Sequence, residues 1–181
     1  MAEPLSAAAC RIAVVGFGHP DRCDDRLGWH AVEQLARRGW EGKVALIARH
    51  QLEIEDAETV AGLDRVVFVD ARVDDPNGPP RRDWELAPIA ARVESTAISH
   101  CLTPATVLAL AEALYGRAPA EAWLGTARAY RLDFGRELSA PALAAAESLI
   151  GEIEALLGRW LDPSAGERAP AQVPSRCTSS R

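Results

Sequence analysis

The sequence predicts an α/β protein with a largely parallel sheet between two helical layers. A β-branched run over residues 12–15 enters a Gly-x-Gly turn at Gly16 and Gly18, and an amphipathic pattern follows it. A second run, RVVFVD over residues 65–70, is continuously apolar, as in a strand that is buried on both faces. Helical patterns then alternate with strand patterns along the chain. This alternation favours parallel strands with helices on both faces of the sheet.

Five strands are expected from the apolar runs. The run over residues 84–89 is flanked by prolines and charges, which favours the edge of a sheet, where a missing N–H group is tolerated. The loop before it, residues 73–82, is rich in proline and glycine. The predicted strands cover residues 12–15, 43–48, 65–70, 84–89 and 122–126.

Four helices are expected between and after these strands. Thr103-Pro104 is a typical helix start, with threonine as N-cap and proline in the first turn, and Gly116 ends that helix. Ser139 begins the last helix in the same manner. The predicted helices cover residues 27–35, 54–63, 104–114 and 140–157. We therefore expect one domain over residues 1–161. Residues 162–181, rich in Pro, Ser, Gly and Arg, are expected to form a disordered tail.

Composition restricts the classes of partner. The 181 residues carry a formal net charge of −6 at pH 7, which argues against nucleic acid or an anionic membrane as a main partner. We see no apolar run of membrane-spanning length and no signal-peptide pattern. The four cysteines form no C-x-x-C pair, so free thiols and a cytoplasmic location are expected.

The loop after the first strand does not fit a dinucleotide. The Gly-x-Gly-x-x-Gly fingerprint needs a third glycine, and position 21 is an aspartate. Asp21, Asp24 and Asp25 would repel a diphosphate. An acidic loop of this kind favours a cation.

Three potential metal ligands follow predicted strands or precede a predicted helix. Asp25 lies in the loop after the first strand, Asp70 ends the RVVFVD run, and His100 lies just before the Thr103 cap. In a parallel sheet the three side chains are expected at one rim. Two carboxylates and one imidazole suit a borderline divalent ion such as Ni, Zn, Co or Fe, with coordination positions left open.

Each of these residues also has an ordinary structural interpretation. Asp25 could cap the first helix, Asp70 could be a turn residue at a strand end, and His100 could lie on the surface. Asp25 and Asp70 could also share a proton as an acidic dyad, although the D-T-G surroundings of aspartic proteases are absent. Cys23 and Cys101 are interpreted as small buried hydrophobic residues.

The ordered set of motifs resembles the hydrogenase maturation endopeptidases, which trim the C-terminus of the [NiFe]-hydrogenase large subunit. The family motif G-x-G-N-x-x-x-x-D-[DE]-x-x-G is matched over residues 16–28, and the strand that ends in D-A is matched by Asp70-Ala71. The histidine before a helix is matched by His100. The late G-x-x-L-S segment is matched over residues 135–139. The resemblance covers roughly residues 11–160.

This resemblance implies a three-layer α/β/α sandwich and a monomeric protease. Asp25, Asp70 and His100 would be its catalytic and metal-contacting residues. The nickel would be supplied by the large-subunit precursor, and no organic cofactor is implied. A self-contained metal hydrolase and a non-catalytic nickel- or precursor-binding chaperone remain the alternatives.

Two departures from the family pattern bear on the substrate. His19 replaces the usual asparagine, and Arg49-His50-Gln51-Leu52 stands where many members carry D-G-G-T. We therefore expect Gly18, His19, His50 and Gln51 to contact the substrate.

Overall fold

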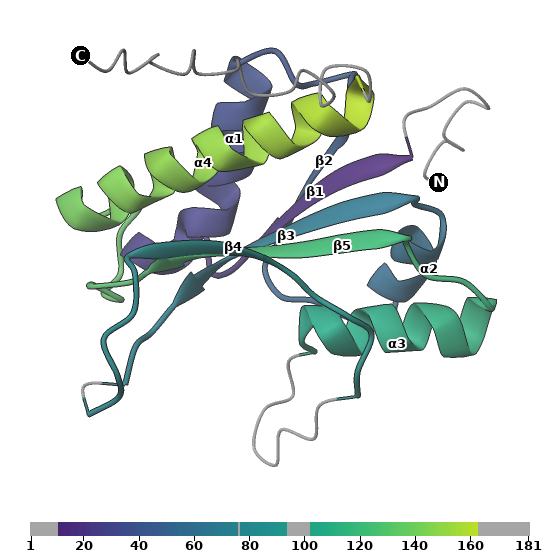
Figure 1. Ribbon diagram of the computed structural model, residues 1–181. Coiled ribbons are helices and arrows are strands. Elements are labelled where there is room, and N and C mark those ends of the chain that lie inside the picture. The colour runs from purple at the N-terminus through teal and green to yellow at the C-terminus, as the bar shows by residue number, and fades with distance from the viewer. Residues whose placement is uncertain (1–10, 76, 94–101, 163–181) are drawn as a thin grey trace, which may run out of the picture.

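A computed structural model of the chain describes residues 11–75, 77–93 and 102–162. They contain one five-stranded sheet with the strand order β2-β1-β3-β5-β4 (Figure 1). Three pairings are parallel, and β4 alone is antiparallel to its neighbour β5. The strands are β1 (Ile12–Phe17), β2 (Ala45–Arg49), β3 (Arg65–Arg72), β4 (Trp84–Pro88) and β5 (Glu121–Arg128).

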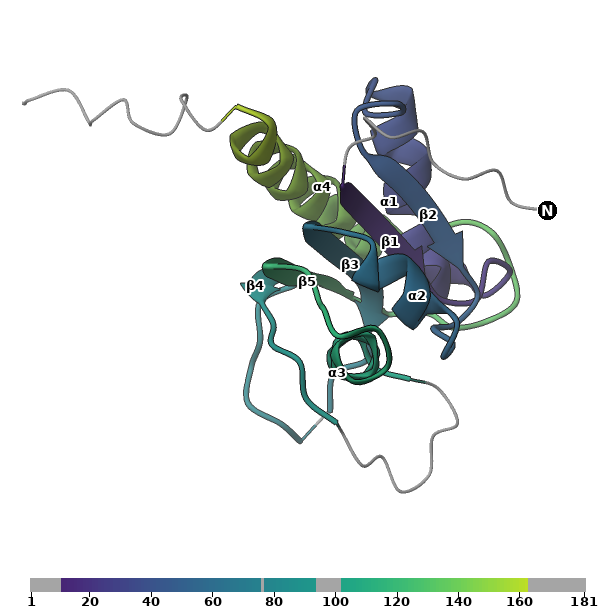
Figure 2. The same cartoon turned by 90° about the vertical axis from the view of Figure 1, so that its right-hand side faces the viewer.

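The helices cover both faces of this sheet, as Figures 1 and 2 show from two directions. One face packs against α1 (Leu27–Arg37) and α4 (Ala140–Leu161), and the other packs against α2 (Asp56–Ala61) and α3 (Pro104–Tyr115). A short 3₁₀ turn, η1 (Cys23–Arg26), precedes α1. The predicted three-layer α/β/α sandwich is confirmed. No helix of the described ranges is long and apolar enough to cross a membrane.

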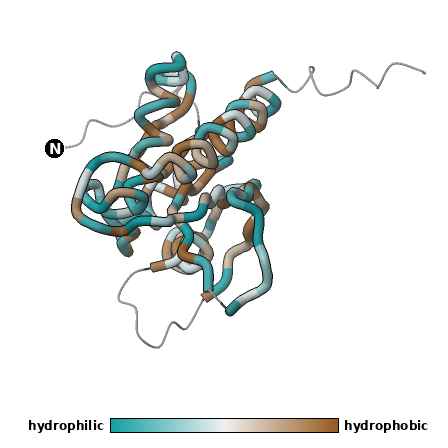
Figure 3. The backbone as a smooth tube through the Cα atoms, turned by 90° about the vertical axis from the view of Figure 1, so that its left-hand side faces the viewer, coloured by the Kyte–Doolittle hydropathy of each residue, from teal (hydrophilic) through white to brown (hydrophobic). Residues whose placement is uncertain are grey.

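Side chains of the central strands alternate between two apolar cores. Val67 and Val69 of β3 face α1 and α4, whereas Val66 and Phe68 face α2 and α3. Both sets are fully buried, as expected for a central strand with helices on each side. In Figure 3 hydrophobic and hydrophilic segments alternate along α4, whose apolar side lies on the sheet.

The predicted element types are confirmed, with small shifts of their ends. The edge strand is β4, and the helix caps are as expected: the Thr103 and Ser139 side chains accept hydrogen bonds from the N–H groups of Thr106 and Ala142. One detail is wrong, because β3 continues two residues beyond Asp70. Residues 163–181, almost all of the predicted tail, lie outside the described residues.

The start of α1 lies directly against β1 and β3 because glycine stands on both sides of the contact. A Cβ atom added to Gly28 would lie 2.4 Å from the backbone N and O of Phe17 and 2.6 Å from the O of Val69. A Cβ atom on Gly16 would lie 2.0 Å from the O of Gly28. No side chain fits here without moving the helix away from the sheet.

Gly28→Ala is therefore expected to lower the free energy of unfolding by about 3 kcal/mol or more, because the added methyl group meets backbone atoms and not flexible side chains. Gly151→Ala is the matched control. Its Cβ meets nothing within 4 Å, so the better helix propensity of alanine should raise stability by about 0.5–1 kcal/mol. Urea denaturation followed by circular dichroism measures both. Equal stability of the two variants would contradict the close contact.

Candidate active site

Asp24, the first residue of the acidic pair, is a buried structural anchor. Its carboxylate accepts hydrogen bonds from the backbone N–H groups of Tyr130, Arg131 and Ser139 at 2.6–2.8 Å, and from the Ser139 hydroxyl at 2.8 Å. Burial raises the pKa of Asp24, but the hydrogen bonds from Ser139, Tyr130 and Arg131 outweigh it, so the net pKa is lowered. The pair thus divides into one carboxylate that holds the fold and one that is available for chemistry.

Asp25 is half-buried at the rim where the parallel strands end. Its Oδ2 atom accepts a hydrogen bond from the N–H of His19 at 2.9 Å. The N-cap residue of α1 is Arg26, without a side-chain cap, so the alternative that Asp25 caps this helix is wrong. Within the described residues its Oδ1 atom has no hydrogen-bond partner and remains available to a ligand.

Asp70 lies on β3 and interacts electrostatically with Asp25. Burial raises the pKa of Asp70 to about 7; the N–H of Ala71, which donates to Oδ1 at 2.8 Å, lowers it, and the charge of Asp25 raises it further. Asp25 and Asp70 lie at the same rim, because Gly28, three residues after Asp25, meets the carbonyl of Val69, the neighbour of Asp70. Two nearby carboxylates at a strand rim, one with its pKa near neutrality, are typical of a functional site.

Two histidines lie in the loops after β1 and β2, and the first of them, His19, contacts Asp25 through its backbone N–H. The rings of His19 and His50 meet edge to face, with their centroids 4.5 Å apart. The Nδ1 atom of His19 accepts the N–H of Asp21 at 3.2 Å, so the neutral ring carries its proton on Nε2. Gly18 links the two loops, since its N–H donates to the carbonyl of His50 at 3.2 Å. Its positive φ of 131° and the close Asp25 carbonyl explain why glycine stands there.

Trp29 is a positioning residue that sequence reasoning missed. Its indole N–H donates to the carbonyls of Gly18 and Arg49 at 3.0 and 2.9 Å. These bonds join the loop after β1 to the end of β2. The contacts span 11 and 20 residues, and the local pattern gives no signal for them. Gln51 is exposed beyond His50, with its amide 3.5 Å from Glu53.

His100, the third predicted metal ligand, lies outside the described residues. The described part of the chain contains no group of three His, Cys, Asp or Glu side chains that could hold a metal ion. Asp25 and Asp70 share one rim as expected, and their joint contact with a metal, like that of His100, stays a prediction. Cys23 is buried as expected, and the Arg131 guanidinium lies 3.2–3.3 Å from its sulfur atom.

Solved structures of hydrogenase maturation proteases share this fold. The E. coli endopeptidase HybD matches with a TM-score of 0.59 and 19% identity over 83% of this chain and 93% of that one. HycI from Thermococcus kodakarensis matches with a TM-score of 0.61 and 22% identity over 84% and 95%. A hydrogenase 2 maturation peptidase from a Thaumarchaeota archaeon matches with a TM-score of 0.59 and 24% identity over 82% and 98%. No family model and no curated protein matches the chain. The fold is that of the hydrogenase maturation endopeptidases.

Asp24→Asn is expected to lower the free energy of unfolding by about 2–4 kcal/mol, because its amide group faces N–H donors that it cannot all satisfy. Asp21→Asn is the control, since Asp21 is a surface residue that pairs with Arg136. The urea midpoint measures both variants. An unchanged midpoint for Asp24→Asn would contradict the anchoring role.

The raised pKa of Asp70 predicts a pH-dependent stability. The folded protein holds the Asp70 proton up to a pKa of about 7, whereas the unfolded chain loses it near pH 4. The stabilisation that this proton gives to the folded protein is fully present below pH 4 and is lost as the pH rises through 7. Asp70→Asn, which resembles the protonated form, should therefore gain about 2 kcal/mol over wild type between pH 4 and pH 8, after allowance for partial solvent screening. Glu112→Gln, at an exposed position, is the control. A difference in the free energy of unfolding between Asp70→Asn and wild type that stays constant with pH would refute the raised pKa.

Proposed function

We propose that this protein is an endopeptidase that removes the C-terminal extension of a [NiFe]-hydrogenase large-subunit precursor after nickel has been inserted. In this proposal Asp25, Asp70 and His100 contact the nickel carried by the precursor. The two described carboxylates at the strand rim carry the proposal, and the shared fold supports it. The protein would act in the cytoplasm as a monomer.

The chemistry of the residues supports nickel sensing over permanent nickel binding. Two carboxylates and one imidazole leave coordination positions vacant, so they should hold a free ion weakly. They bind firmly to an ion whose remaining ligands are precursor cysteines, because the two ligand sets then complete one coordination sphere. Cleavage would thus follow only after correct metal loading.

The chain's own residues also supply a proton site. Before nickel is bound, the Asp70 carboxyl group, with its pKa near 7, holds or releases a proton at neutral pH. The edge-to-face histidines, Gly18 and Gln51 belong to the loops after β1 and β2, and the first of these loops also contacts Asp25 through the N–H of His19. These four residues are the proposed contacts to the precursor.

The decisive test offers nickel-loaded and metal-free precursor to the same chelator-stripped enzyme. Cleavage of only the loaded precursor is the expected result. Equal cleavage of both forms would overturn nickel sensing. Metal that copurifies in stoichiometric amount and is required for activity would favour a self-contained hydrolase. Binding of the precursor without cleavage would favour a chaperone.

His100→Ala is expected to abolish processing and to leave the fold intact. A histidine outside the predicted strands and helices contributes little packing, so the free energy of unfolding should change by about 1 kcal/mol or less. Unprocessed precursor should accumulate in cells that carry the variant, and gel mobility of the large subunit measures this. His30→Ala, in α1, is the comparison for a histidine outside the site. Normal processing by His100→Ala would remove His100 from the proposal.

A further inference from the structure

Strand β4 presents a free edge beside the candidate site. Among the described strands it pairs only with β5. The N–H of Arg128 donates to the carbonyl of Asp83 at 2.7 Å, and the N–H of Ile89 donates to the carbonyl of Ala122 at 2.9 Å. Hydrogen bonding alternates along an antiparallel strand, so the backbone groups of Trp84 and Leu86 point away from β5. These groups form an open ladder for an added strand.

Two hollows lie on opposite faces of this strand. Toward α4 a hollow of about 610 Å³ has Trp84, Leu86 and Trp123 among its walls. Toward α3 a hollow of about 280 Å³ includes Ala87 and Ile89. Side chains of an extended peptide alternate between the two faces of a sheet, so a strand added at β4 reaches both hollows.

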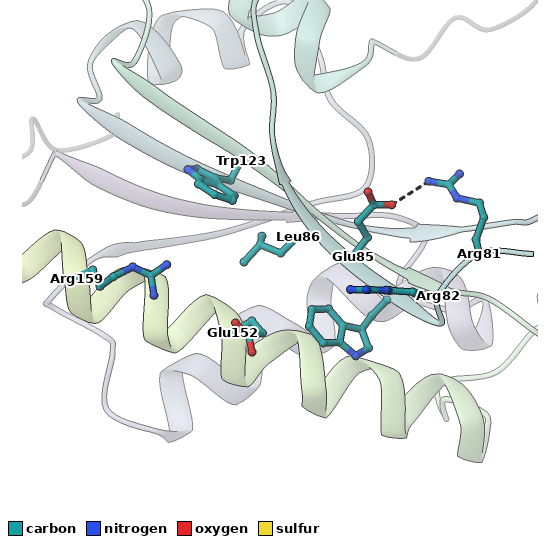
Figure 4. A pocket seen from close by; sticks show the side chains of 8 residues that line it. Arg81, Arg82, Glu85, Leu86, Trp123, Glu152 and Arg159 are labelled. Atoms are coloured by element: carbon teal, nitrogen blue, oxygen red, sulfur yellow. Dashed lines mark hydrogen bonds and ion pairs between the residues drawn. The ribbon is translucent and has the colours of Figure 1, made fainter. Parts of the chain in front are cut away.

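Unpaired arginines surround the larger hollow. Figure 4 shows Arg82 and Arg159 at opposite ends, with Leu86 and Glu152 between them, and Arg81 directed to Glu85 at 3.0 Å. Within the described residues Arg82 and Arg159 have no ion-pair partner. The lining thus holds three guanidinium groups against the two carboxylates of Glu85 and Glu152. This local excess of one positive charge favours an acidic ligand, although the chain has a net charge of −6.

The same charges argue against this chain's own C-terminal residues as the occupant. Residues 163–181 contain three arginines and one glutamate, a formal charge of +2. They would bring positive charge to a positive hollow. A partner with acidic and apolar side chains is the better fit.

The edge is continuous with the candidate site. Asp70 pairs in register with Thr126 of β5, and Thr126 pairs with Glu85 of β4. The three residues form one row on the α2 and α3 face of the sheet. Strands lie about 4.8 Å apart, so a strand added beyond β4 lies about 15 Å from Asp70, the span of four or five extended residues.

We propose that the free edge of β4 binds an extended segment of the protein substrate as a sixth strand. The segment places an apolar side chain against Trp84, Leu86 and Trp123 and an acidic side chain between Arg82 and Arg159. The partner's identity as the hydrogenase precursor rests on the proposed function above. The edge holds the precursor while a neighbouring part of it reaches Asp70.

The first test reverses the charges of the hollow in the full-length protein. Arg82→Glu with Arg159→Glu should raise the KM for nickel-loaded precursor about tenfold. The kcat should stay within about twofold, because neither residue touches the reacting atoms. Arg37→Glu with Lys43→Glu, which changes the charge equally on an exposed surface away from the rim, should leave KM unchanged. An unchanged KM for the first pair, with normal wild-type cleavage, overturns the edge proposal alone.

The second test addresses the backbone ladder. Leu86→Pro and Leu86→Ala both remove the side chain, but only proline removes the outward N–H group. Proline is tolerated at an edge strand, and we expect it to weaken precursor binding several-fold beyond alanine. Circular dichroism confirms folding, and equal binding by two folded variants overturns the added strand. If Leu86→Pro does not fold, the charge-reversal pair decides.

Two further measurements exclude other occupants. Deletion of residues 163–181 should leave KM unchanged, and a fall in KM would show that this segment occupies the edge. Sedimentation should show a monomer, and a dimer that Leu86→Pro disperses would make a second copy the occupant. Wild-type protein that neither binds nor cleaves the precursor overturns the proposed function and the edge proposal together.

Discussion

The buried carboxylate of Asp24 is the constraint on which the rim of this protein depends. A buried charge is tolerated only when it is fully hydrogen-bonded, and Asp24 meets this condition with partners from residues 130–139. Those bonds fix η1 against the start of α4 and hold Asp25, the next residue, at the rim. Cys23 beside it adopts φ 33°, a strained conformation held by its N–H bond to Gly135 at 2.7 Å. The anchor thus orients the residue available for chemistry.

The environments of Asp24 and Asp70 separate two roles within one type of side chain. Asp24 receives donors on both oxygen atoms, and its pKa falls. Asp70 receives one backbone donor and the repulsion of the Asp25 charge, so burial dominates and its pKa rises to about 7. A carboxyl group with many donors remains charged and structural, whereas one with few donors and an acidic neighbour exchanges protons near neutral pH. Glycine at positions 16 and 28 lets α1 approach closely enough for both to share one rim.

Local chemistry made most of the fold predictable. Side-chain periodicity identified the strands and helices, and the caps at Thr103 and Ser139 begin their helices as the sequence indicated. The position of Asp25 and Asp70 at one rim followed from parallel strands that end there. The different roles of Asp24 and Asp25 were not predictable, because the partners of Asp24 lie more than 100 residues away in sequence. Trp29 was missed because its partners, 11 and 20 residues away, lie on other elements and leave no local sequence pattern. The extension of β3 past Asp70 depends on pairing with β5.

The reversed direction of β4 links the free edge to the candidate site. If β4 ran parallel to the other strands, it would start at the end of the sheet opposite the rim. Because it is antiparallel, it starts at the rim, where Trp84 lies beside Ala127. It ends at Pro88 beside Trp123, toward the start of β5. Because α3 leads back to the start of β5, its own first turn lies on the rim side, and the N–H of Arg92 donates to the carbonyl of Ala105 there at 3.0 Å. Val93 and Leu102 therefore both lie near the first turn of α3, on the face of the sheet that carries Asp70.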